Sequence, residues 1–77
     1  MEKNYFTRKI NVVTGNTSEI SFYETEENAQ KAFNTSARVN ALNYGQTFWR
    51  LWTDKDGVKN CDYGDYGHYL QMGKLHK

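Results

Sequence analysis

The feature that most constrains this chain is a single change of hydrophobic period. Apolar and polar residues alternate over residues 5–14 and 19–23, which predicts two half-buried strands. From Thr25 onward the apolar spacing becomes three and four, which predicts one helix. An alternating, aromatic-rich pattern then returns for the rest of the sequence. A chain of this kind has only one helix with which to cover a sheet.

The start of the helix is well signalled and its end is not. Thr25 can accept hydrogen bonds from the free N–H groups of the first turn, where two glutamates favour the positive end of the helix dipole. Leu42 falls almost opposite Phe33, so either the helix ends near Asn40 or Leu42 is exposed within it. Gly45 favours the earlier end. The expected buried stripe consists of Ala29, Ala32, Phe33, Ala37 and Ala41.

The remaining segments predict an antiparallel sheet. The turn around Gly15 joins the first two strands into a hairpin. Residues 46–53 and 58–63 predict a second hairpin, and residues 68–72 a short fifth strand. Seventy-seven residues without proline leave room for one domain, residues 1–77, and no rigid linker. We therefore expect an α+β fold of order ββαββ(β), with four to five strands and the helix on one face.

The alternation also predicts which residues face the helix. In the first hairpin we expect an inward set of Phe6, Ile10, Val12, Ile20 and Phe22, and an outward set of Tyr5, Thr7, Lys9, Asn11, Ser21 and Tyr23. The third strand allows two registers. Phe48 and Trp52 point inward with Trp49 and Leu51 exposed, or the reverse holds and Phe48, Arg50 and Trp52 form an exposed row. Either register leaves one tryptophan outside the core.

The sheet face that the helix leaves open has three possible covers: a partner protein, the C-terminal segment of the chain, or a second copy. The C-terminal alternative would use Tyr63, Tyr66, Tyr69, Leu70 and Met72. We expect a partner protein, because Trp, Tyr and Arg are enriched at binding hot spots. The predicted contact residues are Tyr23, Trp49, Arg50, Trp52, Tyr63 and Tyr66.

Candidate catalytic and metal-binding residues are few. Cys61 and His68 could pair as thiol and imidazole, but a lone cysteine in a strand is typical of a core. Side chains that can bind a metal ion recur every three positions, at Asp62, Asp65 and His68. The same spacing is typical of a series of tight turns. Residues 54–57 resemble the opening of a calcium loop with its glycine too early. We predict no enzymatic activity, no cofactor and no metal site.

Nucleic-acid binding is the alternative function. Aromatic stacking beside basic groups holds single strands, and Tyr5, Lys9, Tyr23 and Arg50 together with an exposed tryptophan offer both. A net charge of +1 and four nearby glutamates disfavour it. The sequence has a single cysteine, no apolar leader and no long apolar run, so we expect a cytoplasmic protein without membrane contact.

One segment carries a resemblance. Residues 22–33, Phe-Tyr-Glu-Thr-Glu-Glu-Asn-Ala-Gln-Lys-Ala-Phe, are similar to the strand-to-helix junction of many small α+β proteins of bacteria and their phages. This resemblance implies a phage or mobile-element accessory protein, of the kind that includes anti-CRISPR inhibitors. Such proteins bind and occlude a host or defence protein without catalysis. We therefore expect a non-enzymatic, protein-binding inhibitor.

Overall fold

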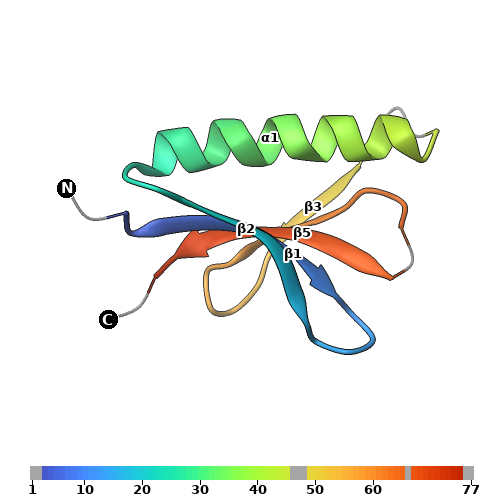
Figure 1. Cartoon of the computed structure of the whole chain (residues 1–77), viewed down its shortest axis with the longest axis horizontal. Helices are drawn as coiled ribbons and strands as arrows, with labels where there is room; N and C mark the ends of the chain where they lie inside the picture. Colours follow the sequence, from blue (N-terminus) through green and yellow to red (C-terminus); the bar gives the residue numbers. More distant parts are fainter. Residues whose placement is uncertain (1–2, 46–48, 66, 76–77) are drawn as a thin grey trace.

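The computed structural model describes residues 3–45, 49–65 and 67–75. One helix lies across an antiparallel sheet of five strands, so the predicted α+β class and the predicted element order are confirmed (Figure 1). In chain order the elements are β1 (Tyr5–Asn11), β2 (Thr17–Tyr23), α1 (Glu26–Asn43), β3 (Arg50–Thr53), β4 (Lys59–Asp62) and β5 (His68–Lys74).

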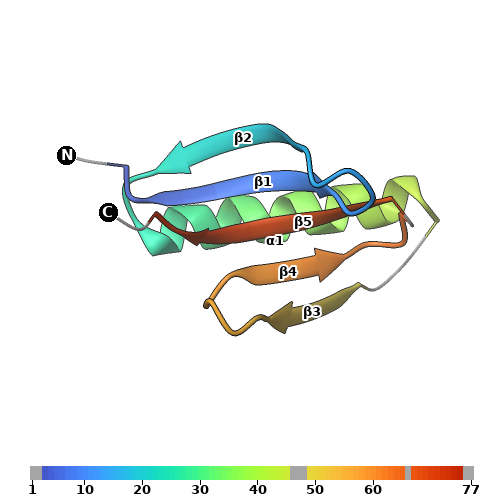
Figure 2. The same ribbon diagram turned by 90° about the horizontal axis from the view of Figure 1, so that it is seen from below.

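The last strand occupies the middle of the sheet. The strand order is β2-β1-β5-β4-β3, and every neighbouring pair is antiparallel. Figure 2 shows the hairpins β1–β2 and β3–β4 on either side of β5. The alternative in which the C-terminal segment folds over the second face of the sheet is therefore wrong. Leu70 and Met72 instead contribute to the main core from within the sheet.

The helix begins where the sequence predicts and ends later. The Thr25 Oγ1 atom accepts a hydrogen bond from the Asn28 N–H at 3.1 Å. The helix continues to Asn43 because Ala41, which is fully buried, extends the packed stripe by another turn. Leu42 is therefore inside the helix and 61% exposed, which corrects the expected end near Asn40. Gly45, with a φ of 72°, follows the end of the helix.

The main core lies between α1 and the middle of the sheet. The helix contributes Ala29, Phe33, Ala37 and Ala41, and the sheet side contributes Cys61, Tyr63, Leu70 and Met72. Three of the four helix residues are alanines, so the helix can approach the strands closely. Phe33 is the only large side chain that α1 buries among the described residues. The helix packs on β5, β1 and β2, and extends much less over β3 and β4 (Figure 2).

The two faces of the first hairpin are the reverse of those predicted. Tyr5 and Tyr23 pack against the main core, and the Lys9 ammonium reaches the helix at Asn40 Oδ1. The prediction failed because alternation shows which residues share a face, not which face the helix covers. The pairing of β1 with β5 decides which face the helix covers. Thr7 lies opposite Met72, which belongs to the main core, so Thr7 lies on the helix side. The expected inward residues Phe6, Ile10, Ile20 and Phe22 thus alternate to the other face, and Val12 lies in the turn.

A smaller cluster forms on the face away from the helix. The Phe6 ring lies over Gly73, its partner across the β1–β5 pair. A Cβ atom at Gly73 would lie 3.1 Å from two atoms of this ring and 3.4 Å from Val58 Cγ2. The Arg8 guanidinium carbon lies 4.9 Å from the ring centre. Phe6 is therefore buried although no helix covers it.

Candidate functional site

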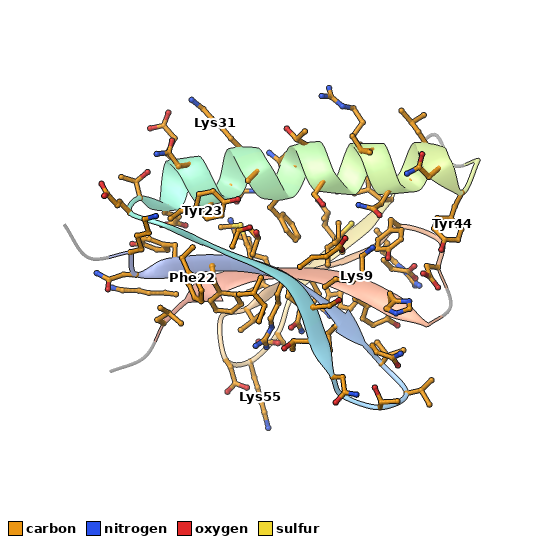
Figure 3. The ribbon with its side chains drawn as sticks, viewed as in Figure 1. Lys9, Phe22, Tyr23, Lys31, Tyr44 and Lys55 are labelled. Atoms are coloured by element: carbon orange, nitrogen blue, oxygen red, sulfur yellow. The ribbon has the colours of Figure 1, made fainter. Side chains whose placement is uncertain are left out.

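The candidate site is the sheet face opposite α1, which we call the open face. Figure 3 shows Tyr23 directed toward the helix and Phe22 directed away from it. Ile20 and Phe22 are each 48% exposed, and Trp52 is 38% exposed. Apolar side chains so exposed are ordinary when scattered, but these share one face. The residues that define the open face in the argument below are Arg8, Ile20, Phe22, Arg50, Trp52, Tyr69 and Gln71.

A row of hydrogen-bonded side chains crosses the centre of the open face. The Arg8 Nε–H donates to Gln71 Oε1 at 2.8 Å, and the Gln71 amide donates to Asn60 Oδ1 at 2.8 Å. The Asn60 amide donates in turn to the carbonyl of Val58 at 3.1 Å. These bonds join β1, β5 and β4, and they fix the direction of each polar group. The centre of the face is therefore polar and ordered.

A cluster of aromatic and charged side chains lies at the β3 end of this row. The Trp52 and Tyr69 rings meet edge to face with centres 5.2 Å apart. The Arg50 guanidinium donates to Asp62 Oδ2 at 2.9 Å while its side chain stays 76% exposed. This hydrogen bond, together with one from the Gly64 N–H, lowers the pKa of the Asp62 carboxyl. The lowered pKa favours the ionised carboxylate that accepts the bond from Arg50.

A cluster of apolar side chains lies at the β2 end of the row. Phe22 stands opposite Phe6 across the β1–β2 pair, and Ile20 follows two residues away on the same face. Phe6 is buried, so Ile20 and Phe22 carry most of the apolar surface here. The open face therefore has two apolar regions separated by the polar row.

The structure brings together only part of the predicted contact set. Arg50 and Trp52 share the open face, so the second register is the one found, although Leu51 on the helix side is 53% exposed and is not buried by it. Trp49 and Tyr23 pack against the main core on the helix side. Tyr63 is completely buried and offers no surface to a partner. Phe48 and Tyr66 lie outside the described residues.

The sequence patterns did not identify the open-face residues that the β1–β2 hairpin contributes. Ile20 and Phe22 were assigned to the core, although their alternation already placed them on a common face. Arg8 was not singled out either, and Tyr69 was named only as part of the C-terminal segment that could cover this face. Their signal lies in the β1–β5 register, which places Arg8 opposite Gln71 and Ile10 opposite Tyr69. Sequence periodicity does not contain that register.

The residues predicted for a nucleic-acid surface do not all lie on one face. Tyr5, Lys9 and Tyr23 lie on the helix side of the sheet, whereas Arg50 lies on the open face. Lys9 is also paired with Glu19 Oε2 at 3.1 Å. The arrangement expected for a stacking platform beside a cationic groove is thus divided between two faces.

Asp65, in the connection between β4 and β5, makes turn contacts. Asp65 accepts a hydrogen bond from the Gly67 N–H at 2.9 Å, and its Oδ2 atom lies 2.9 Å from both the Tyr44 hydroxyl and His68 Nδ1. The bond from Gly67 is the main cause of the lowered pKa of Asp65. In the part of the chain that the structure describes, no three His, Cys, Asp or Glu residues are placed to share a metal ion.

The lone thiol belongs to the main core. Cys61 is fully buried, and burial followed by the nearby Asp62 charge raises its pKa to about 11. His68 bonds Asp65 rather than the thiol. A protonated, inaccessible thiol is a poor nucleophile.

Comparison with protein-family models, with curated proteins and with solved structures finds no match to this chain. Within the described residues, the helix is neither long nor apolar enough to cross a membrane.

Proposed function

We propose that this chain is a non-enzymatic protein-binding module whose contact surface is the open face. One observation carries the proposal: the single helix covers one side of the sheet, and the other side keeps Ile20, Phe22 and Trp52 partly exposed. Contact with a partner removes this surface from water at a gain of about 25 cal/mol per Å² of apolar area.

The composition of the open face supports contact with a protein. Protein interfaces combine apolar and aromatic anchors with polar groups of fixed direction. Phe22 and Trp52 supply the anchors, and the Arg8–Gln71 and Arg50–Asp62 pairs supply oriented polar groups. Because these pairs are already formed, binding costs little further side-chain entropy.

The mode of action that we propose is occlusion of a surface on a larger host or defence protein. The support is the resemblance of residues 22–33 to small phage and bacterial proteins, together with the small size of the domain. A sheet of this size can cover a recognition surface on a larger protein without any chemistry of its own.

Capture from a bacterial lysate tests the contact surface. We expect Phe22→Asp and Trp52→Ala each to weaken capture of a partner by about fivefold or more, as for residues that contribute over 1 kcal/mol. Val39→Asp is the matched control, because Val39 is 48% exposed like Phe22 but lies on the outer side of α1. Circular dichroism confirms that each variant is folded. Capture unchanged by both open-face variants would refute the proposed surface.

A fluorescence titration separates the protein partner from single-stranded nucleic acid. Trp52 is partly exposed, so a base stacked on it would quench its emission. We expect no quenching by a single-stranded oligonucleotide at low salt. Quenching that weakens steeply as salt is added would replace the proposal with nucleic-acid binding.

A further inference from the structure

We infer that the free edge of β2 is a pairing site for β2 of a second copy of this chain. This strand is at the end of the sheet, and among the described strands it pairs with β1 alone. In Figure 2 it forms the outer border of the sheet, with α1 behind β1 and β5 rather than beyond β2. The inference concerns the backbone edge of β2 rather than the open face, although the side chains of Ile20 and Phe22 belong to both, and it does not depend on the proposed function.

Apart from the bulge at Glu19, the edge of β2 has little of the usual protection against pairing. Exposed edge strands commonly carry lysine or proline, or are very short. The seven residues Thr17–Tyr23 contain neither lysine nor proline, and their one charge is Glu19. The Glu19 Oε2 atom lies 3.1 Å from the Lys9 ammonium nitrogen. Glu19 has a backbone φ of 52° and lies where the β1–β2 register shifts. The strand at the opposite edge, β3, has only four residues and carries Arg50.

The hydrogen bonds of β1 show which backbone groups of β2 are free. The Asn11 N–H donates to Asn16 on the β2 side at 2.8 Å, whereas the Val12 N–H donates to Gly67 on the β5 side at 2.9 Å. Backbone groups alternate between the two sides of a strand. The odd-numbered residues of β1 therefore bond toward β2, and the even-numbered ones bond toward β5.

This alternation fixes the direction of the β2 backbone. Thr7 pairs with Ser21 and Tyr5 with Tyr23, so the N–H and C=O groups of Ser21 and Tyr23 point toward β1. The N–H and C=O groups of Phe22, which lies between these two residues, point to the free edge. The same alternation directs the N–H and C=O groups of Ile20 to the free edge. A second strand can bond to these groups without displacing any existing pair.

One antiparallel register suits two identical strands best. It places Ile20 of each copy opposite Phe22 of the other, and Ser21 opposite its own counterpart on the two-fold axis. Pairs of a β-branched and an aromatic residue are among the favourable cross-strand pairs. Glu19 then faces Tyr23, so no two like charges are opposed. Four backbone hydrogen bonds form, two from each Ile20–Phe22 pair.

The size of the contact predicts a dimer of modest affinity. A seven-residue strand is about 23 Å long at ~3.3 Å per residue, and a sheet edge is roughly 10 Å deep, so the contact covers roughly 230 Å² per partner, well below the ~800 Å² of a standard interface. The two-fold axis of an antiparallel pair is perpendicular to the sheet, so both helices lie on the same side. The two open faces therefore join into one continuous surface with Ile20 and Phe22 of both copies at its centre.

A disulfide across the two-fold axis tests the register. Ser21 lies in a pair whose Cα atoms are about 4.5 Å apart, within the range that a disulfide spans. Under mild oxidation of the purified chain, we expect Ser21→Cys to form a covalent dimer on a non-reducing gel. Thr35→Cys, on the exposed side of α1, is the control and should remain monomeric. Cys61 is buried and does not compete.

Amide hydrogen exchange tests the unmodified chain. Exchange of the Phe22 amide should slow by about tenfold at a concentration where nine-tenths of the chains are paired, since it then proceeds from the unpaired fraction. The Ser21 amide faces β1 and should be protected equally at high and low concentration. A chain that stays monomeric by light scattering at its highest soluble concentration would overturn the inference. So would a dimer in which Phe22 exchange is independent of concentration, or one that Ser21→Cys does not trap.

Discussion

Gly73→Ala tests the packing of the smaller cluster on the open face. The new Cβ atom would lie 3.1 Å from the Cε1 and Cζ atoms of Phe6, where carbon atoms normally stay 3.5 to 4.0 Å apart. The ring must therefore move by roughly half an ångström, and overpacking of this kind costs about 1–3 kcal/mol. Alanine also restricts the unfolded chain, which returns about 0.4–1 kcal/mol. We expect a net destabilisation of about 1 kcal/mol, which lowers Tm by roughly 4–8 °C in a domain of this size.

The control for this prediction is Gly73→Ala in a variant whose residue 6 has a shorter side chain than phenylalanine. Leucine at position 6 has neither Cε1 nor Cζ, so in a Phe6→Leu background the alanine should meet no clash and should raise stability slightly. Urea denaturation of the four proteins gives a double-mutant cycle, with an expected coupling of about 1–2 kcal/mol. An equal effect of Gly73→Ala in both backgrounds would show that the contact with Phe6 is not what excludes a side chain here.

Three further outcomes follow from contacts described above. Thr25→Ala should cost about 1 kcal/mol in urea denaturation, because the Asn28 N–H loses its acceptor; an unchanged midpoint would mean that the cap contributes nothing. The pKa of Asp65 is lower in the folded chain than its unfolded value of about 3.9, so its stabilisation is present above about pH 4 and is lost as pH falls through the folded pKa. Urea midpoints at pH 7 and pH 3 should therefore differ less for Asp65→Asn than for the wild type, and equal differences would contradict this. Ellman's reagent at pH 8 should label Cys61 in urea but not in the native chain, since burial raises the thiol pKa to about 11; rapid native labelling would refute the buried position.

The helix and the strands could be predicted from the sequence because their signals are local. The cap at Thr25 and the buried spacing of Phe33 depend on residues within a few turns of one another. The length of the helix was underestimated, because the position of Leu42 opposite Phe33 was taken as a sign that the helix had ended, although Ala41 beside it belongs to the buried stripe. An exposed leucine costs little, whereas Ala41 gains burial against the sheet.

The candidate site depended on pairings between distant segments, and these could not be predicted. Arg50 and Trp52 were identified correctly as neighbours on one face because they belong to one strand. Phe22 was assigned to the wrong side, since its face is set by β5, which joins β1 from the other end of the chain. Periodicity orders residues within a strand, and only the register between strands orders the faces.

The central position of β5 has a consequence for folding kinetics. Tyr5 pairs with Lys74, so the sheet joins the two ends of the described chain. The two hairpins have local contacts that form within microseconds, but they share no hydrogen-bonded edge until β5 enters between them. Closing so long a loop carries a large entropic cost before any contact repays it, and chains of high contact order fold in milliseconds to seconds. During synthesis, β5 leaves the ribosome after the other four described strands, and until then the inner edges of both hairpins are unpaired.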